Sequence, residues 1–444
     1  MRILLISTYE LGHQPLHLAA PAAELRAAGH EVETRDLAVE GWDPALLEGV
    51  EAVAISVPMH TALRLAIEVA RRVRGQRPGL PVAFYGLYAG VSRDTTAGLV
   101  DRYICGEYED ALESWAGAMG DGGAASGATV HIGRRRFRVP DRSTLPALDR
   151  YAHLATPAGH ELVGYVEASR GCRHRCGHCP IPAVYDGRYR VTGRETALDD
   201  ISQLVEAGAG HVTFGDPDFL NAPAYSMGVL EEAHERFGHL TFDVTVKVEH
   251  LVRHRSLLAR MAEAGVIFVV SAMETLDDRV LALLDKGHTA ADAVRAVELV
   301  REAGIDIHPT WLPFTPWTTP GSVAEIARFV WERGLAPVTD PVQLTIRLLI
   351  PDGSLLLERP ELAPHLTGYD ESSLGYSWRA ADPAADELQA ELARMAEDDA
   401  ASGVEPAVTL GGMSETIGAA AGVEIPAGAG AGAARPRLTE PWFC

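Results

Sequence analysis

The sequence is poor in cysteine, in positive charge and in long apolar runs. It has five cysteines among 444 residues, three of them clustered, which excludes a framework of disulfides. Lysine and arginine number 39 against 61 acidic residues, so the chain, at a net charge of −22, lacks the basic surface of a protein that tracks nucleic-acid phosphates. No stretch reaches the roughly 18 apolar residues of a membrane span, and residues 1–6 are too short for a signal-peptide core. We expect a cytoplasmic protein without nucleic-acid or membrane partners.

What the chain does contain is enough apolar residues, 47%, for packed cores in two or three domains. Residues 1–120 alternate short apolar runs with helical periodicity, which predicts a parallel sheet with helices on both faces. Ligands of such sheets bind beyond the carboxyl ends of the strands, here the loops 8–15, 56–61 and 86–92. The expected strands are 3–7, 32–36, 52–57, 82–85 and 103–105, with helices over 16–28 and 61–73.

The three clustered cysteines are the strongest chemical signal. Cys172, Cys176 and Cys179 form a CxxxCxxC array within EASRGCRHRCGHCPIPAVYDG. Three thiolates on one short loop can hold three irons of a 4Fe–4S cluster and leave the fourth open to a substrate or cofactor. A closed zinc or iron site needs four protein ligands. A zinc knuckle that uses His174 or His178, or three unrelated thiols, are the alternatives.

This loop resembles the signature of the radical S-adenosylmethionine (SAM) enzymes. The family usually has an aromatic residue just before the third cysteine, where this chain has His178. The resemblance implies a cluster whose open iron chelates the amino and carboxylate groups of SAM. It also implies that one electron cleaves a carbon–sulfur bond, which requires a reducing partner such as flavodoxin or ferredoxin.

Residues 161–355 repeat a strand–helix rhythm that fits the partial (β/α)6 barrel of this family. The whole chain is therefore predicted as α/β: a doubly wound N-terminal domain over 1–120, a linker over 121–160 and the barrel, then a helical extension over 356–417 and a flexible tail over 418–444. At the start of the linker, the Gly/Ala/Ser-rich residues 119–130 indicate a surface turn or flexible connection. The expected barrel strands are 163–168, 210–215, 240–246, 266–271, 305–312 and 342–349, and the expected helices are 196–207, 223–236, 254–263, 289–303 and 321–333.

In barrels of this kind the chemistry gathers at the carboxyl ends of the strands. The resemblance places SAM contacts at Gly215, Asp216 and Asp218 in the turn after the second strand, with Asp216 facing the SAM amino group. A helix cap or a turn is the alternative for this Asp-Pro-Asp run. Lys247 either neutralises the SAM carboxylate or pairs with Glu249.

Further along the barrel, Ser271 and Glu274 are candidates for contacts with ribose hydroxyls. Residues 274–288 look like the family's module of an acidic residue, a short helix and Lys-Gly. Arg347 is expected to bind an anionic substrate group or a structural carboxylate. Aromatic side chains near the fifth strand either line a substrate pocket or pack beneath a lid; these are His308, Trp311, Phe314 and Trp317.

Residues 1–120 resemble the cobalamin-binding domain that precedes the barrel in many radical SAM enzymes. The DxHxxG motif that supplies an axial histidine to cobalt is missing, since the corresponding loop reads STYELGHQP with His13 wrongly spaced. The sequence YGLYAG replaces the usual pair of glycines after the fourth strand. Cobalt would lack a lower imidazole ligand unless His13 or a water served. Some radical SAM methylases do without that ligand, so the resemblance leaves cobalamin as an expected cofactor. A domain that instead shapes the substrate pocket or a partner interface is the alternative.

These features predict a radical SAM enzyme that modifies a small molecule. With cobalamin, it would transfer a methyl group to an unactivated carbon or phosphorus. Without cobalamin, it would donate the aminocarboxypropyl group of SAM to a thiol, selenium or arsenic. A non-enzymatic iron–sulfur redox protein is the alternative from another class, and tRNA methylthiolation is disfavoured by the acidic charge.

The end of the chain points to a narrower group. HCPIP, PFTPWTT, RLLIPDGSLL and RPRLTEPWFC resemble the radical SAM proteins with a CCAEP tail, or a CUAEP tail in which U is selenocysteine. The Ala/Gly-rich residues 418–434 predict a tether that delivers a catalytic thiol, Cys444, to the active site. We expect the natural chain to continue with selenocysteine, against the alternative of a frayed end with an idle thiol.

Overall fold

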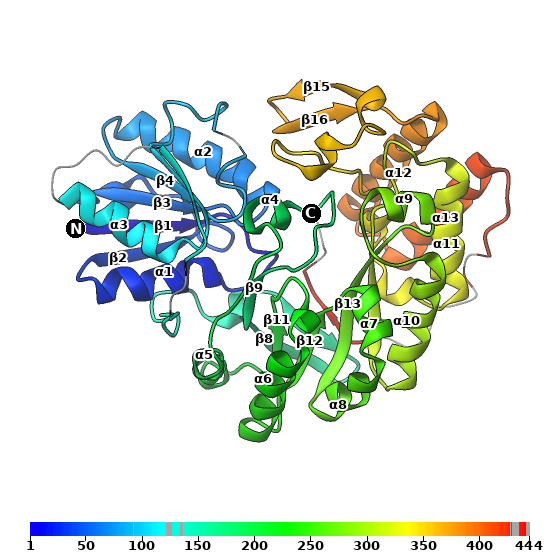
Figure 1. Ribbon diagram of the computed structural model, residues 1–444, viewed down its shortest axis with the longest axis horizontal. Coiled ribbons are helices and arrows are strands. Elements are labelled where there is room, and N and C mark those ends of the chain that lie inside the picture. The colour runs from blue at the N-terminus through cyan, green and yellow to red at the C-terminus, as the bar shows by residue number, and fades with distance from the viewer. Residues whose placement is uncertain (92, 121–126, 134–135, 427, 429–434, 441–444) are drawn as a thin grey trace.

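The computed structural model describes residues 1–91, 93–120, 127–133, 136–426, 428 and 435–440. It contains two large sheets, one in the N-terminal third and one in the barrel (Figure 1). The α/β class, with a doubly wound first domain followed by a partial barrel, is confirmed. Across the described residues, no helix combines the length and the apolarity that crossing a membrane requires.

The N-terminal sheet is parallel throughout. Its strand order is β2 (Glu31–Asp36), β1 (Arg2–Ser7), β3 (Ala52–Ser56), β4 (Val82–Tyr85), β5 (Arg102–Gly106) and β6 (Gly127–His131). It is accompanied by α1 (Leu16–Ala27), α2 (His60–Gln76) and α3 (Glu109–Gly120). Successive residues of β1 enter two separate cores, Leu4 with α2 and Ile3 with α1 and α3, because side chains alternate across a strand. The predicted turn over 119–130 is wrong in its last residues, which form β6 against β5.

The barrel sheet has the order β14 (Asp306–Trp311), β13 (Val266–Glu274), β12 (Thr241–Thr245), β11 (His211–Phe214), β8 (Gly159–Val166), β7 (His153–Thr156) and β17 (Arg437–Leu438). The strands from β14 to β8 are parallel, and β7 and β17 extend one edge in antiparallel fashion. The helices between these strands are α5 (Arg194–Glu206), α6 (Pro223–Arg236), α7 (Val248–Arg253), α8 (Leu258–Glu263), α9 (Asp278–Leu283), α10 (Ala290–Glu302) and α11 (Pro320–Glu332).

The sixth barrel strand, predicted over 342–349, is wrong. Residues Pro341–Leu344 form a 3-10 turn that the Asp340 side chain caps. Proline fixes its own φ and has no N–H to donate to a ladder, so it favours this turn over a strand. Only Arg347 pairs with the barrel, through a single bridge to Phe314.

The C-terminal region differs from the prediction of a helical extension and a tether. A hairpin of β15 (Leu366–Asp370) and β16 (Gly375–Trp378) precedes α12 (Pro383–Ala401) and α13 (Pro406–Ala421). The expected tether begins inside α13, whose Leu410, Met413 and Ile417 are buried in the main barrel core. The spacing of these side chains places them on one helical face, and the first residues of the expected tether, 418–421, continue that packed helix.

The last described residues tie the barrel to the N-terminal domain. Thr439 donates its N–H to the carbonyl of His153 at 2.8 Å, beside the pairing of β17 with β7. The Tyr9 hydroxyl, in the loop after β1, donates to Glu440 Oε1 at 3.0 Å. The C-terminal segment therefore reaches the interface between the two domains.

Candidate active site

The three cysteines lie on the loop between β9 (Ser169–Gly171) and α4 (Pro180–Tyr185). Cys172 and Cys176 are buried, Cys179 is partly buried, and all three are free thiols. The strand β9 pairs with β10 (Tyr189–Val191), which fixes the entry of the loop. Gly171 has a φ of +74°, and a Cβ there would lie 2.5 Å from the Arg188 carbonyl oxygen. The loop therefore begins at a position that only glycine fills.

A buried ion pair supports the loop from the far side. Lys286 Nζ lies 2.9 Å from Glu274 Oε1, and His178 Nε2 lies 3.0 Å from the same oxygen. Burial alone would lower the pKa of Lys286, but the Glu274 carboxylate and the neighbouring Cys176 outweigh it and raise this pKa. Gly177 donates its N–H to the Leu284 carbonyl at 2.9 Å. The predicted module over 274–288 thus places one cation beside the cysteine loop.

The donor set favours a cluster with one open iron over a zinc knuckle. His178 is held by Glu274, and His174 Nε2 lies 3.2 Å from His250 Nε2, so neighbouring side chains engage both imidazoles. The fourth described cysteine, Cys105, lies on β5 in the apolar core of the N-terminal domain. Three thiols without a fourth protein ligand fit a 4Fe–4S cluster that leaves one iron open.

The residues predicted to contact SAM lie around this loop, but the side chains of most of them contact other groups of the same chain. Asp216 accepts hydrogen bonds from the Ala168 N–H at 2.9 Å and from the Ser169 hydroxyl. Its burial raises its pKa to about 7. A Cβ on Gly215 would lie 2.0 Å from the Tyr165 hydroxyl oxygen. Gly215 and Asp216 therefore hold the strand that leads into the cysteine loop, and a contact of Asp216 with SAM stays a prediction.

The other residues predicted to contact SAM also contact groups of the same chain. Asp218 Oδ2 lies 2.7 Å from His250 Nδ1, and the Ser271 hydroxyl donates to the Val246 carbonyl at 2.7 Å. Lys247 Nζ lies 3.5 Å from Glu249, which is the pairing expected as the alternative. Contacts of Asp218, Lys247, Ser271 and Glu274 with SAM stay predictions.

A cavity of about 330 Å³ lies between the two domains, next to the cysteine loop. From the N-terminal domain it is bordered by the loops after β1, β3, β4 and β5, which are the carboxyl ends where the sequence predicts a ligand. From the barrel, Gly171, Ile181 and Gly215 border it. We call it the inter-domain cavity. A second cavity, of about 390 Å³, lies in the barrel interior beside Phe268, His308 and Gln343. No described cysteine borders either cavity, but of the two the inter-domain cavity is the one that reaches residues flanking the cysteine loop.

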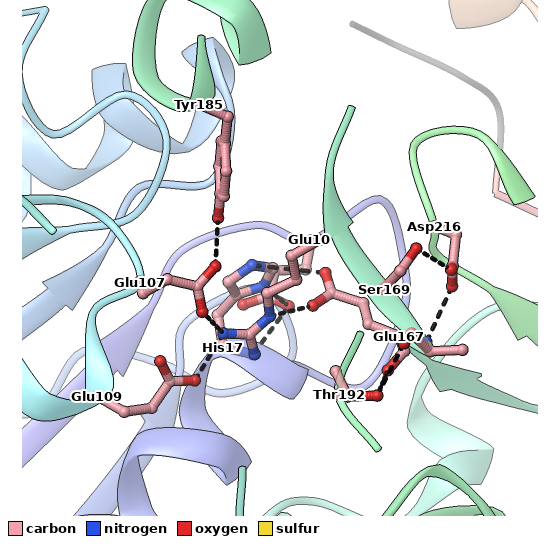
Figure 2. Close-up of polar contacts among 11 residues, drawn as sticks. Glu10, His17, Glu107, Glu109, Glu167, Ser169, Tyr185, Thr192 and Asp216 are labelled. Atoms are coloured by element: carbon pink, nitrogen blue, oxygen red, sulfur yellow. Dashed lines mark hydrogen bonds and ion pairs between the residues drawn. The ribbon is translucent and has the colours of Figure 1, made fainter. Parts of the chain in front are cut away.

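A group of buried charges spans the inter-domain cavity (Figure 2). Arg170 donates to Glu109 at 2.6 Å and to Glu167 at 2.7 Å, and its nearest atom lies 3.8 Å from Glu107. His17 Nδ1 lies 3.0 Å from Glu10 Oε2, and its Nε2 lies 3.9 Å from Glu167. We call this set the glutamate cluster, consisting of Glu10, Glu107, Glu109, Glu167, Arg170 and His17.

The sequence analysis missed the glutamate cluster. A signal was present, because Glu10 follows the first strand and the run GEYED follows the fifth strand of the N-terminal sheet. Both positions are carboxyl ends of parallel strands, where ligands bind. Arg170 lies two residues before Cys172 in the same segment, but its position beside the cysteines predicted no role for it.

Several expected pocket residues lie elsewhere. Arg347 donates to Asp386 at 2.6 Å and to the Trp378 carbonyl at 2.6 Å, so it serves the structural alternative. Trp311 and Phe314 are buried in the barrel core, and Trp317 lies in a smaller core beneath the hairpin. His308 borders the barrel-interior cavity. Cys444 lies outside the residues that the structure describes, so its role and the selenocysteine continuation stay predictions.

His13, in the loop after β1, contacts the barrel. Its ring centroid lies 4.7 Å from that of Tyr165, and burial lowers the pKa of His13 to about 4, so its imidazole is neutral, the form in which histidine binds metals. A cobalt ligand at His13 stays a prediction. His17, the other imidazole at this cavity, is bonded to Glu10.

Comparison with known proteins places these features in a family. Residues 166–330, from the end of β8 to α11, match the sequence profile of the Radical SAM superfamily. The matched region contains the three cysteines and the Glu274–Lys286 pair.

Two curated relatives are methylases. Hopanoid C-3 methylase of Methylococcus capsulatus is 23% identical over 311 residues, covering 66% of this chain and 60% of the relative. Hopanoid C-2 methylase of Rhodopseudomonas palustris is 23% identical over 176 residues, covering 38% of this chain and 33% of the relative. The chain thus matches less than two thirds of the length of each.

Two solved structures share the arrangement of both domains. The radical SAM methyltransferase TsrM from Kitasatospora setae, with tryptophan and a SAM analogue bound, has a TM-score of 0.63 at 20% identity. That match covers 80% of this chain and 74% of TsrM. The cobalamin-dependent SAM radical enzyme OxsB has a TM-score of 0.65 at 12% identity, covering 90% and 66%. At these identities the likeness concerns the fold.

Proposed function

Starting from the radical SAM domain that residues 166–330 form, we propose that this enzyme transfers an alkyl group of SAM to a small molecule held between its two domains. The observation that carries the proposal is the position of the inter-domain cavity. It reaches Gly171 and Ile181, which flank the cysteine loop on either side, and the ligand-binding edge of the N-terminal sheet borders it from the other domain. Its volume of about 330 Å³ suits a small-molecule substrate.

Cys172, Cys176 and Cys179 would hold a 4Fe–4S cluster. When bound, such a cluster supplies the electron that cleaves a carbon–sulfur bond of SAM. Lys286 and Glu274 hold the loop from the barrel side, and the buried position of Cys172 and Cys176 keeps water from the metal site. On the opposite side, Asp216 fixes the backbone that enters the loop. The protein thus contributes a rigid, dry setting.

Cobalamin stays a proposed cofactor, since TsrM and OxsB, which share this fold, have solved structures with cobalamin bound. Of the two imidazoles that border the inter-domain cavity, His17 is bonded to Glu10 and His13 packs on Tyr165. The roles derived for this chain's residues do not depend on a cobalamin.

The names of the relatives make a methyl group the first candidate for transfer, and the aminocarboxypropyl group is the second. Either route needs an electron donor, for which flavodoxin or ferredoxin is the proposed partner.

The test uses the full chain, purified and reconstituted without oxygen. We expect about four iron and four sulfide per chain, as a 4Fe–4S cluster requires, and cleavage of SAM with a chemical reductant. The cobalt content of the same preparation decides whether cobalamin is bound. Mass spectrometry of the nucleoside product identifies the broken bond, since methylthioadenosine indicates aminocarboxypropyl transfer. The triple variant Cys172→Ala, Cys176→Ala, Cys179→Ala should lose both the cluster absorbance and SAM cleavage, while Cys105→Ala keeps both. Cleavage by the triple variant would sink the proposal, and an intact cluster that never cleaves SAM would favour a redox protein.

A further inference from the structure

The glutamate cluster carries more negative charge than its own cations balance. Four carboxylates surround one guanidinium and one imidazole at the domain interface (Figure 2). Arg170 donates to Glu109 and Glu167, and His17 contacts Glu10. Even with His17 protonated, the cluster keeps an excess of negative charge when all four carboxylates are ionised. A buried charge without a partner is costly, so this arrangement favours a cation or a proton at the site.

Glu107 shows the consequence of this excess. Its contacts in the cluster are a hydrogen bond from the Tyr185 hydroxyl at 3.1 Å and the distant Arg170. Burial raises the pKa of Glu107 to about 7, and Glu109 and Glu167 add to that effect against Arg170. At neutral pH the Glu107 carboxyl is therefore partly protonated, which reduces the negative charge of the cluster.

Two buried polar atoms at the same cavity have no hydrogen-bond partner. One is Oε1 of Glu10, whose side chain is bonded only through its other oxygen. The second is the hydroxyl of Tyr108, a residue 2% exposed. Both residues border the inter-domain cavity. Buried polar groups are normally hydrogen-bonded, so two unpaired atoms at one cavity mark where a ligand's polar group belongs.

We propose that the inter-domain cavity binds its substrate through a cationic nitrogen, a protonated amine or a guanidinium, held by Glu10 and Tyr108. The substrate class is then a small molecule with an amine or guanidine group. This inference rests on the proposed function, in which the substrate occupies this cavity. The carboxylate accepts a charge-assisted hydrogen bond from the cation, and the phenol oxygen accepts a second.

The first experiment measures binding of a matched pair of probes to the reconstituted full chain. Saturation-transfer NMR compares n-butylammonium with n-butanol, which has the same alkyl chain and no charge. We expect the ammonium to bind and the alcohol to bind at least about tenfold more weakly, because hydrogen bonds to charged groups contribute about 1.5–3 kcal/mol. Equal binding of the two probes would overturn the inference.

Variants then locate the site. Glu10→Gln should weaken butylammonium binding about tenfold or more, and Tyr108→Phe, which removes only the unpaired hydroxyl, should weaken it several-fold. Glu68→Gln, at an exposed carboxylate paired with Arg71, is the control and should leave binding unchanged. Should Glu10→Gln fail to fold, Tyr108→Phe carries the test, and unchanged binding by the folded variant refutes the site.

Two further outcomes separate this inference from the proposed function. Displacement of butylammonium by SAM would assign the cation site to SAM itself and refute the substrate class. The same preparation is also assayed for SAM cleavage. Cleavage without ammonium binding would refute the inference and leave the proposed function standing, whereas ammonium binding without cleavage would refute the function.

Discussion

Replacing Arg142 by methionine should weaken the fold at the point where the two domains and the linker meet. Arg142 donates to both carboxylate oxygens of Asp200, at 2.7 and 2.9 Å, to Gln14 at 2.8 Å and to the Tyr165 carbonyl at 2.8 Å. The side chains of Arg142 and Asp200 are 7% and 2% exposed, so water cannot solvate a carboxylate left alone. Removing one partner of such a pair costs about 3–5 kcal/mol.

The assay is urea unfolding without oxygen, followed by tryptophan fluorescence. Arg142→Met should lower the free energy of unfolding by about 3–5 kcal/mol, and the double variant Arg142→Met, Asp200→Leu should recover most of that loss. The control is Arg260→Met, because its pair with Glu231 is about half exposed and should contribute less than about 1 kcal/mol. A loss below 1 kcal/mol in Arg142→Met, or a double variant as unstable as the single one, would refute the reasoning.

Two further predictions concern single positions. Burial raises the pKa of Asp36 from 3.8 to about 6, against the hydrogen bond from Tyr151, so its ionised form opposes folding. This penalty is absent below the unfolded pKa and grows to about 3 kcal/mol as the pH rises through 6. The variant Asp36→Asn should therefore flatten the fall in the free energy of unfolding between pH 4 and 7. Urea titrations in which this free energy falls as steeply with pH as in the parent protein would contradict the prediction. Gly171→Ala should lower the melting temperature and the iron content, because its φ is positive and its Cβ meets a carbonyl oxygen. Gly304→Ala, with a similar φ of +79° and open space, separates strain from the clash, and equal iron content in both variants would show that the clash is harmless.

Local patterns predicted most of the fold. In the first strand, alternate apolar residues serve two cores, and a pattern of this kind has only one regular interpretation. The cysteine spacing indicated the metal site for a similar reason, since all three donors lie on one loop. Local composition gave a wrong prediction where tertiary packing determines the structure. The Ala/Gly-rich start of the expected tether is the end of helix α13, because Met413 and Ile417 of that helix pack into the core.

The candidate site was predicted only on its barrel half. The glutamate cluster depends on how two domains face each other, which no periodicity encodes. Glu109 and Arg170 stand 61 positions apart and meet only because the start of α3 lies opposite β9. Tyr9 and Glu440, 431 positions apart, are a more distant case.

The pairing of β7 with β17 also determines when the edge of the barrel sheet can be completed during synthesis. His153 donates its N–H to the Thr439 hydroxyl, 286 positions later in the chain, so within the described residues the outer side of β7 gains its strand partner only once residues 437–439 have been synthesised. At about 5–20 residues per second, that wait lasts roughly 15–60 s on the ribosome. During this time an unpaired strand edge of the nascent barrel is open to other chains. A chain released before Arg437 is added would contain the barrel and its cysteine loop. The outer edge of its β7 would still be unpaired.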